Sequence, residues 1–90
     1  MTKTLLDNET RMNILRYLKK NGECYNAEIA KNLKKPNGEI GYDESKIIRD
    51  LSKLLYNGYI KLVEHLESDK IKYYKLTKKG LKAIENSQTI

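Results

Sequence analysis

The spacing of apolar residues changes at Asn57-Gly58, and this change limits the folds that the chain can adopt. Before it, apolar residues recur every three or four positions, as they do along one face of a helix. After it, residues 59–76 are rich in strand formers and alternate in part between apolar and polar. A last pair, Leu81 and Ile84, returns to helical spacing. The order predicts an α+β domain with three helices, a two-stranded β-hairpin and a C-terminal helix.

The first helix is expected from about Asp7 to Lys20, with Asn21-Gly22 as its stop because both residues tolerate the left-handed conformation that ends helices. Its inward stripe is formed by Met12, Ile14, Leu15 and Leu18. Glu23-Cys24-Tyr25 is too short for a helix and is predicted to be a brief extended link.

A second, shorter helix is predicted to begin with Asn26 as its N-cap. Its apolar face would be formed by Ile29, Ala30 and Leu33. The segment 34–38 breaks this helix, and the loop continues to residue 41. The third helix would begin at Tyr42 or Asp43 and end at Asn57-Gly58, burying Ile47, Leu51, Leu54 and Leu55.

The hairpin is expected to run out along residues 60–66, turn at 67–69 and return along 71–76. Thr77 would then cap the last helix, which ends near residue 86, and Gly80 would let that helix approach a neighbour closely. Tyr73 and Tyr74 must face opposite sides of their strand. Tyr74 is predicted to pack inward, and for Tyr73 cross-strand packing is favoured over stacking against nucleic acid.

Charge indicates the kind of partner. The chain has 90 residues, which predicts one domain, 1–90, with its core from about residue 6 to 86. The formal net charge is +6, and residues 46–90 carry +5 of it. A basic half on a small domain attracts polyanions, most commonly nucleic acid, although a solubilising surface would give the same composition.

Several kinds of site are excluded by residue counts. One cysteine, Cys24, and one histidine, His65, cannot form a Cys/His metal site or an intramolecular disulfide. Cys24 is predicted to be a small buried or half-buried residue, the alternative being an intermolecular disulfide across a dimer. No nucleophile motif or phosphate loop points to an enzyme or a cofactor. No apolar run approaches the length of a membrane span, so a cytoplasmic location is expected.

Four stretches resemble winged helix-turn-helix transcription regulators: residues 6–15, 28–33, 45–60 and 74–80. The sequence is most similar to small archaeal and archaeal-virus members and to the arsenic-repressor and multiple-antibiotic-resistance-repressor groups. The resemblance implies a helix-turn-helix at about 26–57 and a wing at about 59–76. It also implies that the helix at about 43–56 enters a DNA major groove while the wing meets the backbone or minor groove. The loop between the second and third helices is longer than is usual in this family.

The exposed side of the third helix supplies the candidate DNA-binding residues. With Leu51 and Leu54 inward, Ser45, Lys46, Arg49 and Lys53 are expected on the opposite side. Arg49 is the candidate for guanine recognition because its planar fork matches O6 and N7, whereas the lysines suit phosphates. Ile48 stands where a small polar residue is common and could contact thymine methyl groups. The alternative is an ordinary solvated helix face.

On the wing, Lys70 and Lys72 are candidates for phosphate contacts, although Glu67 and Asp69 at the same tip would oppose them. One recognition helix reads few base pairs, so a homodimer through the terminal helices is expected. The predicted function is a sequence-specific regulator that binds double-stranded DNA. The alternative is a winged-helix protein–protein interaction module of a nucleic-acid-handling assembly, which exposed Ile48 and Tyr56 would favour.

Overall fold

The computed structural model describes residues 9–35, 37–63 and 72–87. Its elements, in chain order, are α1 (Glu9–Asn21), β1 (Cys24–Tyr25), α2 (Asn26–Asn32), α3 (Glu44–Tyr56), β2 (Ile60–Val63), β3 (Tyr73–Leu76) and α4 (Lys78–Ser87). This order confirms the α+β prediction of three helices, a hairpin and a closing helix. The predicted wing tip, including Lys70, His65, Glu67 and Asp69, lies outside the described residues, as does the predicted start of the first helix.

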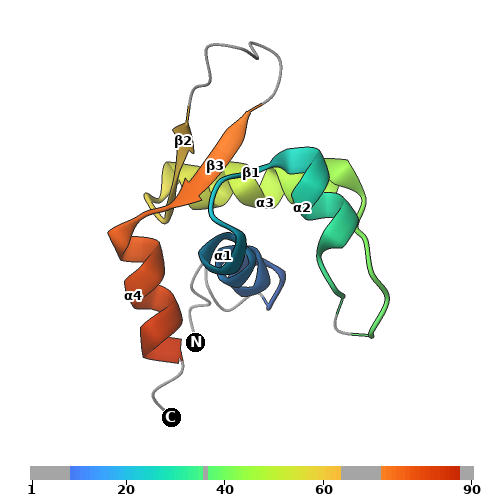
Figure 1. The fold of residues 1–90 in the computed structure, drawn as a ribbon, viewed down its shortest axis with the longest axis horizontal. Helices are drawn as coiled ribbons and strands as arrows, with labels where there is room; N and C mark the ends of the chain where they lie inside the picture. Colours follow the sequence, from blue (N-terminus) through green and yellow to red (C-terminus); the bar gives the residue numbers. More distant parts are fainter. Residues whose placement is uncertain (1–8, 36, 64–71, 88–90) are drawn as a thin grey trace.

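The sheet has three strands and not two, because the expected link at Glu23–Tyr25 contains β1. The strand order is β1-β3-β2, and both pairings are antiparallel. Cys24 lies opposite Tyr74, so β1 closes the free edge of β3. In Figure 1, α1 and α4 lie on one side of α3, and the β2–β3 hairpin extends beyond α3 on the other.

The core lies between α1, α2, α3, α4 and one face of the sheet. Adjacent residues of a strand point to opposite faces of the sheet. Cys24, Ile60 and Tyr74 are the buried strand residues on the face that packs against the helices. The described buried apolar residues are Met12, Ile14, Leu15, Leu18, Cys24, Ile29, Ala30, Leu33, Ile47, Leu51, Leu54, Ile60, Tyr74 and Ile84. The predicted helical stripes therefore form the core, with Leu55 and Leu81 only partly buried.

Three predicted helix boundaries are confirmed, two by local hydrogen bonds and one by the backbone conformation of a glycine. The Asp43 side chain accepts from the Ser45 backbone N–H at 3.3 Å at the start of α3. Gly58, with φ of +82°, follows the end of that helix. At the start of α4, the Thr77 hydroxyl accepts from the Gly80 N–H at 3.2 Å.

The predicted N-cap of α2 is wrong. Asn26 is the first residue of the helix, and Tyr25, in extended conformation and without a side-chain cap bond, precedes it. Strand β1 runs directly into the helix, which leaves no room for a separate capping residue. The Asn26 amide instead donates to the Glu44 carboxylate at 2.6 Å and thereby ties the start of α2 to the start of α3.

The long loop between α2 and α3 folds back on itself. Lys34 and Ile40 form an isolated antiparallel bridge, and the Gly41 N–H donates to the Leu33 carbonyl at 2.9 Å. Gly41 has φ of +105°, a conformation that residues with a Cβ rarely adopt. The Tyr42 N–H then donates to the Ala30 carbonyl at 2.6 Å. The extra length is therefore a closed, hydrogen-bonded turn that returns the chain to α2. None of the described helices has the length and apolarity of a membrane span.

Candidate nucleic-acid interface

One stripe of α3 points directly away from the core. Its members recur at steps of four, three and four residues and are Ser45, Arg49, Ser52 and Tyr56. All four side chains are exposed, and Tyr56 is 92% exposed. The stripe therefore presents two hydroxyl groups, a guanidinium and a phenol to solvent on one straight element.

Every carboxylate at or within α3 is engaged elsewhere. Asp43 caps the helix, and Glu44 accepts from Asn26 at 2.6 Å. Asp50 is 4% exposed and faces α1. The outward stripe consequently carries no negative charge, which is the condition for close approach of a polyanion.

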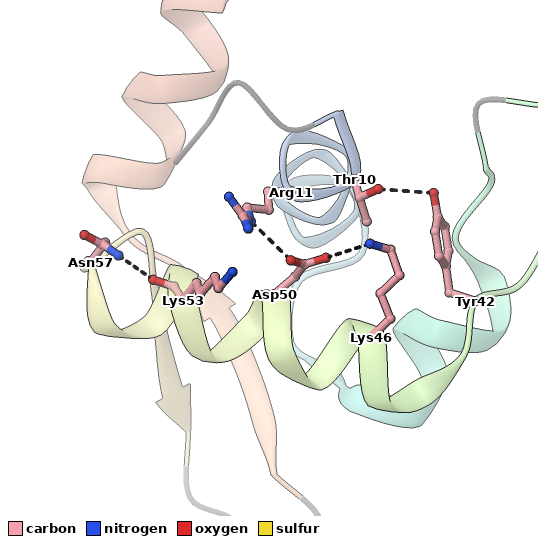
Figure 2. Close-up of polar contacts among 7 residues, drawn as sticks. All are labelled: Thr10, Arg11, Tyr42, Lys46, Asp50, Lys53 and Asn57. Carbon is pink, nitrogen blue, oxygen red and sulfur yellow. Dashed lines mark hydrogen bonds and ion pairs between the residues drawn. The ribbon is translucent and has the colours of Figure 1, made fainter. Parts of the chain in front are cut away.

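A buried ion pair holds α3 against α1, as Figure 2 shows. The Arg11 Nε of α1 donates to Asp50 Oδ1 at 3.1 Å, and the side chains are 14% and 5% exposed. Lys46 Nζ lies 3.9 Å from Asp50 Oδ2, which has no hydrogen-bond partner among the described residues. Because a buried carboxylate is costly without its counter-charge, this pair fixes how α3 sits on α1.

The four residues predicted to share one side of α3 divide into two groups. Ser45 and Arg49 lie on the outward stripe. Lys46 and Lys53 instead lie on the same side of α3 as Asp50, along the flank that faces α1 (Figure 2). Lys46 is partly committed to Asp50, although its side chain remains 49% exposed.

Ile48 lies on the flank of α3 opposite Lys46 and is 40% exposed. Of the two predicted wing lysines, Lys72 is exposed and Lys70 is not described. Sequence reasoning assigned no DNA contact to Ser52 or Tyr56, although their spacing from Arg49 was a sufficient signal.

The outer face of the sheet carries a basic pair that sequence reasoning missed. Lys61 of β2 lies directly opposite Lys75 of β3, and both are exposed. Like charges at directly opposed positions destabilise a sheet, and an external anion relieves that cost. Only the strand register, which places these two lysines side by side, identifies the pair.

Beside this pair, Tyr73 lies opposite both Tyr25 and Val63 on the same outer face. The Tyr25 and Tyr73 ring centroids are 5.7 Å apart in an edge-to-face arrangement. Cross-strand packing, the favoured prediction for Tyr73, is therefore confirmed, and the predicted inward position of Tyr74 is confirmed by its 6% exposure.

Cys24 is fully buried, and its thiol lies 3.7 Å from the Gly22 carbonyl. Burial, with smaller contributions from Glu28, raises the pKa of the Cys24 thiol from 9.0 to about 11. The prediction of a buried residue is confirmed. The alternative, an intermolecular disulfide, would require the Cys24 sulfur to leave this buried position.

No protein-family model and no curated protein matches the sequence. Solved structures are similar in fold. BpsR of Bordetella bronchiseptica, whose DNA binding is regulated by 6-hydroxynicotinic acid, matches with a TM-score of 0.74 at 14% identity. That match covers 96% of this chain and 59% of BpsR.

Two variants of ZitR from Lactococcus lactis, one of them in apo form, match with TM-scores of 0.70 and 0.72 at 22% and 20% identity. They cover 94% and 99% of this chain, and 57% and 56% of ZitR. The chain thus spans less than two thirds of the length of these neighbours. Together with the element order and the sheet, they establish that this chain has the winged-helix fold.

Proposed function

We propose that this protein is a transcription regulator that binds double-stranded DNA sequence-specifically, with α3 in the major groove. The observation that carries the proposal is the acid-free outward stripe of α3. Within it, Arg49 supplies the planar donor pair that suits guanine, and Ser45 and Ser52 supply hydroxyl groups for bases or phosphates. A fold shared with a protein whose DNA binding is regulated supports the same role. The role is that of a binding protein and not of an enzyme.

The wing contributes phosphate contacts in this proposal. The opposed pair Lys61 and Lys75, together with exposed Lys72, places three positive charges on the β2–β3 hairpin. Phosphate contacts orient a protein on the duplex and carry no sequence information themselves. Lys46 and Lys53, on the flank of α3, act in the same way. We also propose a phosphate contact for Lys70, as predicted from the sequence.

A homodimer on two half-sites completes the proposal, because a single recognition helix reads few base pairs. The terminal helices remain the proposed interface. Their described exposed residues are polar or charged, such as Arg16, Lys19 and Glu85, so this part of the interface would be polar. The oligomeric state is tested by analytical ultracentrifugation at micromolar concentration with and without DNA, and a strict monomer in both samples contradicts the dimer.

The test of DNA binding is a fluorescence-anisotropy titration against genomic fragments, including the gene's own promoter, at two salt concentrations. We expect tight binding to a subset of fragments and a steep loss of affinity with salt. Arg49→Ala should reduce discrimination between fragments by about 5- to 150-fold, the equivalent of about 1–3 kcal/mol.

Lys53→Ala should instead weaken all fragments about equally and lower the salt slope by roughly one. Lys19→Ala is the matched control, because Lys19 is an exposed lysine of α1, outside the α3 and wing surfaces that are proposed to contact DNA. Weak binding without preference, or equal effects of the Arg49 and Lys19 substitutions, would contradict the proposed function.

A second candidate function is a protein–protein interaction module, which the exposure of Ile48 and Tyr56 on α3 favours. In that case Tyr56→Ser and Ile48→Ser would abolish capture of a partner protein while Arg49→Ala would not. The acid-free outward stripe, which carries Arg49 beside Tyr56, makes DNA the preferred occupant.

A further inference from the structure

An open groove lies along the outer side of α1, on a different face from the outward stripe of α3. One wall is α1, and the other is the end of α2 with the hydrogen-bonded turn that follows it. Its volume is about 680 Å³, within the range of roughly 300–1,000 Å³ that small-molecule sites occupy. The groove takes no part in the function proposed above.

Positive charge gathers on both walls. Arg16 and Lys20 come from α1, and Lys34 and Lys35 come from the turn, whereas Glu9 is the only carboxylate that lines the groove among the described residues. Lys35 is partly neutralised by Glu39, outside the groove, at 3.7 Å. Lys20 and Lys34 form no ion pair within the described part of the chain. Two walls of like charge therefore face a space large enough for a ligand.

The neutral lining residues are held in place. The Asn21 amide donates to the Tyr17 carbonyl at 3.0 Å, and the Asn32 amide donates to the Glu28 carbonyl at 2.9 Å. Asn13 accepts from Arg16 Nη1 at 3.1 Å, which orients the guanidinium. Donors fixed before a ligand arrives cost less to order when it binds.

We infer that this groove binds a small polyanion, a metabolite with two or more phosphate or carboxylate groups, which bridges α1 and the turn between α2 and α3. A ligand with one anionic group would neutralise only one wall, whereas a polyanion can pair with Arg16 and Lys20 on one side and with Lys34 on the other. Because the turn leads directly into the cap of α3, such a ligand ties α1 to the segment that enters the candidate recognition helix.

The test is an NMR titration of the full ¹⁵N-labelled chain with inorganic tripolyphosphate and, separately, with citrate at 150 mM salt. The side-chain amides of Asn13, Asn21 and Asn32 report on the groove, and the Asn57 amide, at the end of α3, is the internal control. We expect saturable shifts of the three groove amides with at least one of the two anions. The double substitution Arg16→Gln with Lys34→Gln should weaken that binding at least tenfold.

The charge-matched control is Lys19→Gln with Lys82→Gln, two exposed lysines that do not line the groove, and it should leave the affinity unchanged. Shifts that fail to saturate with both anions, or an equal loss in the two double variants, overturn the inference.

A third arm of the experiment adds a DNA duplex to the labelled protein. If the duplex shifts the three groove amides as the anions do, the groove belongs to the DNA interface and the small-ligand inference is wrong. If the duplex fails to bind at all, the proposed function fails while the groove result stands.

Discussion

Replacing Gly80 with alanine sets two physical effects of opposite sign against each other. Gly80 lies inside α4, where glycine normally costs about 0.5–1 kcal/mol relative to alanine, so helix propensity alone predicts stabilisation. A Cβ at this position would collide with the Tyr59 carbonyl oxygen and would lie 2.7 Å from a methyl carbon of Leu76. The first partner is backbone, which cannot move aside as the end of a flexible side chain can.

The collision should dominate. Relieving it requires α4 to move away from the sheet, at a cost of typically 1–3 kcal/mol for an overpacked contact. The Tyr59 carbonyl also accepts from the Thr77 N–H at 3.2 Å, and strain on that bond adds up to about 1 kcal/mol. After the gain in helix propensity is subtracted, we expect Gly80→Ala to destabilise the protein by about 2 kcal/mol. For a domain of this size that is roughly 8–16 °C in Tm.

The assay is urea unfolding followed by circular dichroism, with Lys82→Ala as the control. Lys82 is exposed on the same helix, so its replacement should change the free energy of unfolding by less than about 0.5 kcal/mol. A Gly80→Ala protein as stable as the original, or more stable, would show that α4 does not approach Tyr59 and Leu76 this closely, and the argument would fail.

Three further predictions concern the ion pair, the buried thiol and the wing. Asp50→Ala should lower the free energy of unfolding by about 2–4 kcal/mol, because it removes the buried carboxylate that pairs with Arg11 and holds α3 against α1. A loss below about 0.5 kcal/mol in urea unfolding would contradict the role of this pair. The raised pKa of Cys24 means that the folded state keeps a proton which the unfolded chain loses, so stability should fall by up to about 2–3 kcal/mol as the pH rises from about 9 to 11. Cys24→Ala should remove this part of the pH dependence, and an unchanged profile would refute the assignment. Lys75→Glu should stabilise the sheet by about 0.2–1 kcal/mol by pairing with Lys61, yet weaken DNA binding. Unchanged or tighter DNA binding would contradict the proposed phosphate contacts.

Local rules were sufficient for much of the fold. The helical spacing of apolar residues identified α1, α3 and α4, and the caps at Asp43 and Thr77 are interactions within three residues. The change of period at Gly58 located the hairpin for the same reason. Such features depend on neighbours in the chain, which the sequence displays directly.

The candidate interface was only partly predictable. Spacing along one helix placed Arg49 and Ser45 on the exposed side of α3, and the same rule also includes Ser52 and Tyr56. It could not reveal that Asp50 is buried and paired with Arg11 of α1, 3.1 Å away, because that depends on how α3 packs.

The amino-acid sequence alone determines the order of helices and strands and the charge that favours an anionic partner, because periodicity, capping and charge are local properties. The tertiary structure decides what long-range pairing creates: strand β1 opposite Tyr74, the opposition of Lys61 and Lys75, and the groove between α1 and the turn after α2. Each of these depends on register or on packing between segments far apart in the chain. A shift of one residue in register would turn every strand side chain to the other face, and no local pattern specifies which partner a strand will meet.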